Sequence, residues 1–141
     1  QYGTNLVHLI KDLRAEFKAP DMKAVVGVMG VNGPHNEHNP KQKDVREGQR
    51  FINTVPEFKG NAKAIETAPL LDPRVVALTA GGWLPEYDRD FKKNPITQEE
   101  RAMLGRAMSN KGFHYSGEGR FFILVGKAFA EAMQELLKNS K

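Results

Sequence analysis

The order of apolar and polar positions predicts alternating helices and strands. Residues 4–18 carry an apolar stripe at helical spacing, formed by Leu6, Leu9, Ile10, Leu13 and Phe17. Thr4 or Asn5 can cap this helix, and Pro20 ends it. Residues 23–31, KAVVGVMGV, form a nearly continuous apolar run rich in β-branched residues. Such a run is typical of a strand that is covered on both faces of a parallel sheet.

The rest of the chain continues this alternation. The expected elements are a helix over 43–55, strands at 62–67 and 75–78, a helix over 97–108 and a final helix over 118–141. Thr97, with Glu100 three residues later, forms a capping box. The final helix has an apolar face made of Phe122, Val125, Phe129, Ala132, Met133 and Leu136. The pattern predicts an α/β fold, a single domain over residues 1–141 with helices layered on a short parallel sheet.

Composition narrows the possible functions. The chain has 141 residues, 40% of them hydrophobic and 27% charged, which is ordinary for a globular domain. It has no cysteine, which excludes disulfides, thiol nucleophiles and thiolate metal sites. The net charge of +4 comes from basic residues interleaved with acids, a pattern that argues against a nucleic-acid partner. No run of about 18 apolar residues occurs, so we expect no membrane partner.

His114, within the segment SNKGFHYSGEG, is the main catalytic candidate. Its glycine neighbours permit a sharp turn, and the final helix follows, where unpaired amides create a positive field. This field favours the neutral imidazole that can accept a proton near pH 7. Loops at the end of a parallel sheet carry the catalytic groups of α/β enzymes. The alternative is a loop residue that packs on Phe113 and Tyr115.

Ser116 is the hydroxyl nearest to this histidine in the sequence. A GxSxG nucleophile motif would need glycine at position 114, where the histidine stands. We therefore expect Ser116 to cap the final helix, with Glu118 in its first turn. Ser116 is a nucleophile candidate only if the isolated chain is active.

The strand at 23–31 ends in MGVNG, where Gly30 and Gly33 let the chain turn. Asn32, between them, is a substrate-binding candidate at the end of the sheet where ligands bind. The segment GVMGVNG contains no GxGxxG followed by a helix, so we expect no dinucleotide cofactor.

Two further groups of side chains support alternative functions. Trp83, Tyr87 and Tyr115 are aromatic residues on which a sugar could stack in a non-catalytic carbohydrate-binding or interaction module. His35 and His38, with Glu37 between them, would be the ligands of a metal-dependent hydrolase. No third ligand is evident nearby, and the prolines around these histidines indicate a solvated loop. We therefore expect no metal.

Five sequence blocks follow one another in a distinctive order: NLVHLIKDLRAEFKAP, AVVGVMGVNG, EFKGNAKAIETAPLLD, TQEERAMLGRAMSNKGFHY and GRFFILVGKAFAEAM. Over about residues 5–134 this order resembles the C-terminal half of SGNH-type carbohydrate esterases, in particular sialate O-acetylesterase-like (acetylxylan esterase-related) domains of bacteria. The resemblance implies part of a flavodoxin-like three-layer α/β/α sandwich. It also implies hydrolysis of an acetylated carbohydrate or other small ester, with His114 as the catalytic base just before the C-terminal helix.

The chain departs from the family pattern at two points. The family's nucleophilic serine lies in an early GQSN-like block, which is not found in residues 1–141. The family's acid, three residues before the histidine, is replaced by Lys111, which leaves Asn110 to orient the imidazole. We therefore expect the C-terminal portion of an esterase that lacks triad hydrolysis by itself. An uncovered sheet edge is expected to promote self-association, and the resemblance implies a secreted or periplasmic location.

Overall fold

A computed structural model describes residues 1–31, 33, 40–79, 90, 93–109 and 114–138. The chain forms two compact units. Unit 1 comprises residues 1–29, 39–67 and 126–141, and unit 2 comprises residues 30–38 and 68–125. That residues 1–141 form one domain stays a prediction.

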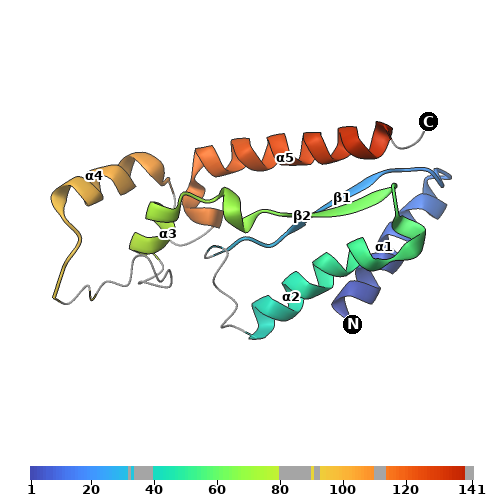
Figure 1. Ribbon diagram of the computed structural model, residues 1–141, viewed down its shortest axis with the longest axis horizontal. Coiled ribbons are helices and arrows are strands. Elements are labelled where there is room, and N and C mark those ends of the chain that lie inside the picture. Colours follow the sequence, from blue (N-terminus) through green and yellow to red (C-terminus); the bar gives the residue numbers. More distant parts are fainter. Residues whose placement is uncertain (32, 34–39, 80–89, 91–92, 110–113, 139–141) are drawn as a thin grey trace. The chain divides into compact units, whose positions relative to one another are not determined.

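Unit 1 is built on a two-stranded parallel sheet (Figure 1). Strand β1 (Ala24–Val28) pairs with β2 (Ala62–Glu66), and Ala24 lies opposite Ala62. The helical elements of unit 1 are α1 (Tyr2–Glu16), α2 (Pro40–Arg50), η1 (Phe51–Thr54), η2 (Pro56–Phe58) and the part of α5 (Gly119–Lys138) from residue 126 onward. The parallel strand pair joined through α2 confirms the expected α/β fold at this level.

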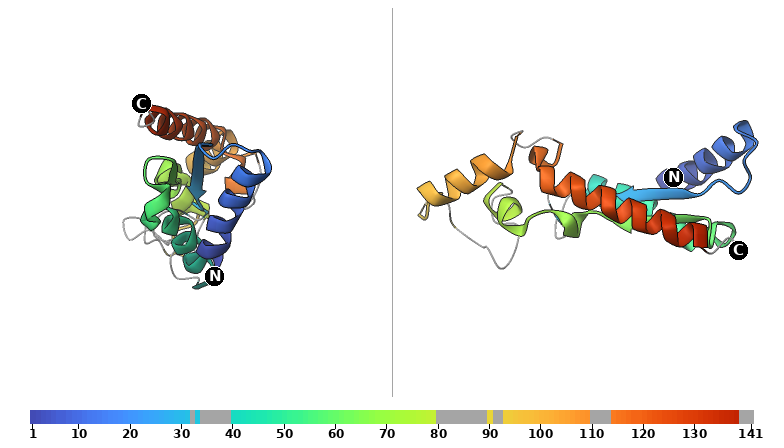
Figure 2. Two further views of the ribbon diagram at one scale, coloured as in Figure 1. Left: turned by 90° about the vertical axis from the view of Figure 1, so that its right-hand side faces the viewer. Right: turned by 90° about the horizontal axis from the view of Figure 1, so that it is seen from above.

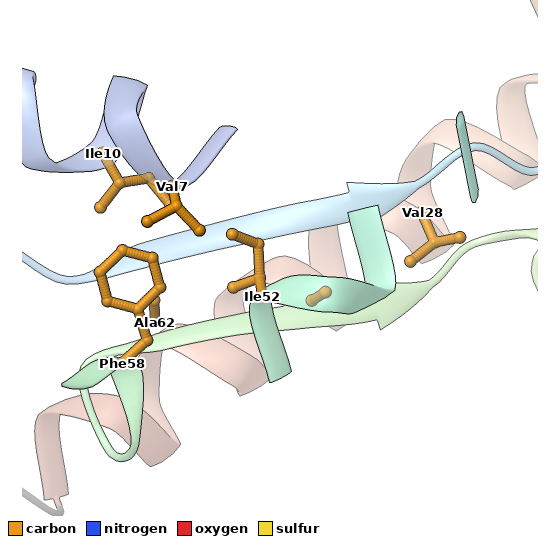
Figure 3. Close-up of a cluster of buried hydrophobic side chains, with 7 residues drawn as sticks. Val7, Ile10, Val28, Ile52, Phe58 and Ala62 are labelled. Atoms are coloured by element: carbon orange, nitrogen blue, oxygen red, sulfur yellow. The ribbon is translucent and has the colours of Figure 1, made fainter. Parts of the chain in front are cut away.

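One face of the sheet is covered by α1, η1 and η2, with α2 on the same side (Figure 1). Val7 and Ile10 of α1 point toward the sheet, where they meet Ile52 and Phe58 in one buried cluster (Figure 3). The strands contribute side chains at alternate positions, namely Val28, Ala62 and Ala64. This cluster is the core of unit 1.

The opposite face of the sheet is covered by the part of α5 from residue 126 onward, which runs along the two strands (Figure 2). The ring of Phe129 lies directly over Gly27, where an added Cβ would stand only 2.8 Å from Cζ of the ring. Lys63 of β2 and Glu135 of α5 form an ion pair with an N–O distance of 2.5 Å. Unit 1 is therefore a small α/β/α arrangement of three layers.

Unit 2 has its own apolar core. Its elements are η3 (Ala68–Leu70), α3 (Pro73–Thr79), α4 (Gln98–Ala107), η5 (His114–Gly117) and the start of α5. Its buried cluster consists of Leu71, Val76, Ala77 and Phe121. The capping box predicted for α4 is confirmed, because Thr97 Oγ1 accepts the N–H of Glu100 while Thr97 N–H donates to Glu100 Oε2.

The strand predicted at 75–78 is wrong, since these residues belong to α3. Asp72 Oδ1 accepts the backbone N–H of Arg74 at 2.9 Å, and Asp72 O accepts the N–H of Val76 at 3.0 Å. Pro73 follows at the first helical position, where its missing N–H costs nothing. This strong start signal outweighs the β-propensity of the two valines.

The two predicted apolar stripes are confirmed in part: Ile10 of α1 and Ala132 and Leu136 of α5 are buried as expected, whereas other members of each stripe are exposed. Helix α1 begins at Tyr2 rather than near Thr4 or Asn5. Its buried residues include Val7 and Ile10, whereas the predicted Leu9, Leu13 and Phe17 are exposed. In α5 the buried aromatic ring belongs to Phe121, which is 2% exposed, whereas the predicted Phe122 is 49% exposed. In the described ranges, no helix has the length and apolarity needed to cross a bilayer.

Candidate active-site turn

The turn that begins at His114 has an unusual backbone. Three successive residues adopt the left-handed conformation, Tyr115 with φ 55°, Ser116 with φ 59° and Gly117 with φ 62°. Each of the two residues that carry a side chain is strained in this region by about 1–3 kcal/mol. Such strain persists only where surrounding contacts fix the backbone, and it clusters at functional sites.

Hydrogen bonds to the main chain hold both sides of this turn. The backbone N–H of Ser109 donates to Ser116 O at 3.1 Å, and Ser109 Oγ donates to Gly117 O at 2.9 Å. The N–H of Glu118 donates to Tyr115 O at 3.1 Å. The segment after α4 and the start of α5 are therefore tied together at the turn.

The side chain of Tyr115 links this turn to the loop that follows β1. Its ring stacks on Phe121, with ring centroids 4.3 Å apart and an interplanar angle of 24°. Its hydroxyl oxygen accepts the backbone N–H of Gly30 at 3.3 Å. One face of the Tyr115 ring is therefore covered by Phe121, and its hydroxyl oxygen is occupied as a hydrogen-bond acceptor for Gly30.

The loop after β1 turns as its glycines predict. Gly33 has a φ of 81°, and its N–H donates to Gly30 O at 3.0 Å. Gly33 also lies against α3, where an added Cβ would stand 3.0 Å from Cγ1 of Val76. The position therefore requires glycine for both its conformation and its close contact. The prediction of a turn at Gly30 and Gly33 is confirmed.

A charged group lies beside the apolar contacts of unit 2. The carboxyl group of Glu118 is buried, with 3% of the side chain exposed. Its Oε2 accepts the N–H of Asp72 at 3.4 Å, and its Oε1 lies 3.7 Å from Nη1 of Arg120. Arg120 Nη1 also donates to Leu70 O at 3.4 Å. Glu118 thus connects the start of α5 to the start of α3.

Asp72 is the next charged residue in this group. Its carboxylate accepts hydrogen bonds from Nε and Nη2 of Arg74 at 3.2 and 2.9 Å. These hydrogen bonds from Arg74 are the main cause that lowers the pKa of Asp72 below its ordinary value, while partial burial opposes them. Asp72 therefore acts as an ionised cap at the start of α3.

The structure places the predicted site residues as follows. His114 opens the turn, and Ser116 is its half-buried third residue. The predicted capping role of Ser116 is wrong, because α5 begins at Gly119 and Glu118 occupies the position before it. The other candidates lie outside the described residues: Asn32, His35, Glu37, His38, Trp83, Tyr87, Asn110 and Lys111. Within the described part of the chain, no three ligating side chains gather where a metal ion could bind.

Two features of the site were not predicted from the sequence. Burial of the Glu118 carboxylate was not expected, since an acid in a first helical turn usually faces solvent. The bond between Tyr115 and Gly30 joins residues 85 positions apart, and no local pattern signals it. The glycines around His114 were the sequence signal for the sharp turn, and one of them, Gly117, adopts the positive φ that glycine permits.

Comparison of the chain with protein-family models, with curated proteins and with solved structures found no match in any of the three.

Proposed function

We propose that the chain forms the C-terminal portion of a serine-type carbohydrate O-acetylesterase in which His114 acts as the general base. The observation that carries this proposal is the left-handed turn at His114–Gly117, which Tyr115 joins to the loop following β1. Catalytic groups of α/β proteins lie on loops after parallel strands, and strained turns cluster at active sites. The order of the sequence blocks supports the same assignment.

In the proposed reaction, the imidazole of His114 accepts the proton of a serine hydroxyl while the serine oxygen attacks the acetyl carbonyl. The imidazolium then gives this proton to the departing sugar oxygen, which leaves an acetyl-serine. Water, deprotonated by the same imidazole, attacks the acetyl-serine, and acetate and free serine result. In this proposal the serine and the donors to the oxyanion come from outside residues 1–141, and Asn32 contacts the substrate.

In the proposed mechanism the turn keeps the general base in position. A general base must lie within hydrogen-bond reach of the proton that it abstracts, so the backbone that carries it must not drift. The two bonds from Ser109 and the bond between Tyr115 and Gly30 restrain this backbone. The strain at Tyr115 and Ser116 is offset by these contacts.

The test uses the natural protein that contains this chain, with acetylated xylo-oligosaccharides and 4-nitrophenyl acetate as substrates. We expect acetate release that a serine-directed fluorophosphonate abolishes, with the label on a serine outside residues 1–141. Absence of acetate release from both substrates, activity that persists after complete labelling, or a label on Ser116 contradicts the proposal.

A further inference from the structure

The surface of unit 1 is hollowed where the start of α1 meets the end of α2, two helices that lie beside each other (Figure 1). Two glycines permit the close approach of the helices. A Cβ added at Gly3 would stand 3.0 Å from Gly48 O, and one added at Gly48 would stand 2.9 Å from Gly3 N. The hollow has a volume of about 520 Å³. Sites for small molecules typically have volumes of roughly 300–1,000 Å³, so this one is large enough for a ligand.

Two aromatic rings line the hollow. Each lies against a glycine, because a Cβ added at Gly3 would stand 2.9 Å from Cδ1 of Phe51, and one added at Gly48 would stand 2.8 Å from Cδ1 of Tyr2. Tyr2 is nevertheless 46% exposed and Phe51 is 44% exposed. The face of an aromatic ring is negative, so it attracts the weakly positive C–H groups of a ligand. Both rings therefore offer open surface on which a ligand could stack.

The polar side chains of the lining supply both donors and acceptors of hydrogen bonds. Asp44 and Glu47 of α2 contribute carboxylates, which accept only. Gln1 contributes an amide and Thr4 a hydroxyl, and both groups can donate and accept. Nζ of Lys43 lies 3.8 Å from Oε1 of Glu47, and both of these side chains are exposed. The carboxylate of Glu47 therefore stays open to a further donor.

This lining fits a neutral ligand with many hydroxyl groups better than it fits an ion. A sugar hydroxyl both donates and accepts, and the C–H face of a sugar ring can lie on an aromatic ring. An anion would meet the charges of Asp44 and Glu47. A cation would meet the N-terminal end of α1, which carries a positive partial charge, in a chain whose net charge is +4.

We propose that the hollow between α1 and α2 binds a segment of a carbohydrate chain. The rings of Tyr2 and Phe51 lie against the sugar rings, and the carboxylates of Asp44 and Glu47 accept their hydroxyl groups. The residues of the hollow belong to unit 1, whereas the turn at His114 belongs to unit 2, so this is a second site and not a part of that turn. The choice of a xylose chain as the probe rests on the proposed function.

The test is a titration of the protein with unacetylated xylohexaose, followed by NMR through the backbone amide signals of Gly3 and Gly48. We expect both signals to shift saturably, with a dissociation constant on the order of 1 mM. The double variant Asp44→Ala, Glu47→Ala should bind at least about fivefold more weakly, because the sugar loses its acceptors. Tyr2→Ala should also weaken the binding, because it removes one of the two stacking surfaces.

The matched control is the double variant Asp12→Ala, Glu16→Ala, which removes two exposed acids of α1 outside the hollow and should leave the affinity unchanged. Three outcomes overturn the proposal: no saturable shift with xylohexaose, equal affinity of the Asp44→Ala, Glu47→Ala variant and wild type, or saturation of the same signals by choline and not by xylohexaose. Xylohexaose carries no acetyl ester, so its binding is measured independently of acetate release, and either result can fail without the other.

Discussion

The hydroxyl oxygen of Tyr115 accepts the backbone N–H of Gly30 at 3.3 Å, and this bond joins the turn of His114 to the loop that follows β1. The two residues are 85 positions apart in the sequence. The ring of Tyr115 is fixed in turn by stacking on the buried Phe121. The side chain of Tyr115 thus connects the strained turn to the loop at Gly30 that follows β1.

Replacement Tyr115→Phe tests this link. The ring and its stacking remain, while the N–H of Gly30 loses its acceptor, so we expect a loss of about 0.5–1.5 kcal/mol in the free energy of unfolding. Urea unfolding followed by circular dichroism measures it. The control is Tyr2→Phe, at a ring that is 46% exposed on α1. Equal stability of the two variants would show that the Tyr115 bond contributes nothing.

Removal of the buried carboxylate at position 118 is expected to destabilise unit 2. Glu118→Ala leaves the N–H of Asp72 without its acceptor and removes the charge beside Arg120, which costs about 1–3 kcal/mol. Glu118→Gln keeps an acceptor and should cost less. Glu131→Ala on the same helix is the control, since its pair with Lys127 is exposed and is worth about 0.3–0.5 kcal/mol. A Glu118→Ala variant as stable as Glu131→Ala contradicts the role given to the buried acid.

Acid stability should depend on Asp72. Its pKa is lowered in the folded chain, mainly by hydrogen bonds from Arg74, so the unfolded chain binds more protons at this site as the pH falls. The stabilisation is therefore complete above the ordinary pKa of about 3.9 and is lost as the pH falls through the lowered value.

Thermal unfolding of Asp72→Asn and wild type between pH 7 and pH 2 measures this effect. The stability difference should be constant at higher pH and should shrink below about pH 4. Asp12→Asn, at an exposed position of α1, is the matched control. The same acid dependence in Asp72→Asn and wild type rules out the proposed contribution.

Two glycine replacements are expected to change the free energy of unfolding in opposite directions, one at the contact between β1 and α5 and one within α5. Gly27→Ala places a methyl group 2.8 Å from the rigid ring of Phe129, and such overpacking costs about 1–3 kcal/mol. Gly126→Ala lies in α5 with no atom within 4 Å of the added Cβ, so it should stabilise by roughly 0.5–1 kcal/mol. Denaturant unfolding compares the two variants. Stabilisation by Gly27→Ala would mean that α5 does not pack closely on the sheet at this residue.

The pattern of apolar and polar positions was sufficient to predict α1, α2, α4, α5 and the parallel strand pair. It failed where a local signal competed with it, as at Val75 and Val76, which the Asp72 cap draws into a helix. It also failed to distinguish Phe121 from Phe122, because neighbouring apolar residues leave the phase of a helical stripe open. The glycines around His114 predicted a sharp turn, but the long-range contacts of Tyr115 and Glu118 depend on tertiary packing, which no local pattern contains.

The central claim is that His114 is the general base of an acetylesterase, and the most direct measurement is kcat for acetate release by the natural protein carrying His114→Ala. His8→Ala, which removes an exposed imidazole of α1, is the matched control. We predict that kcat falls by about 10³-fold or more in His114→Ala and stays at the wild-type value in His8→Ala. An unchanged kcat in His114→Ala, with the protein folded by circular dichroism, would contradict the claim.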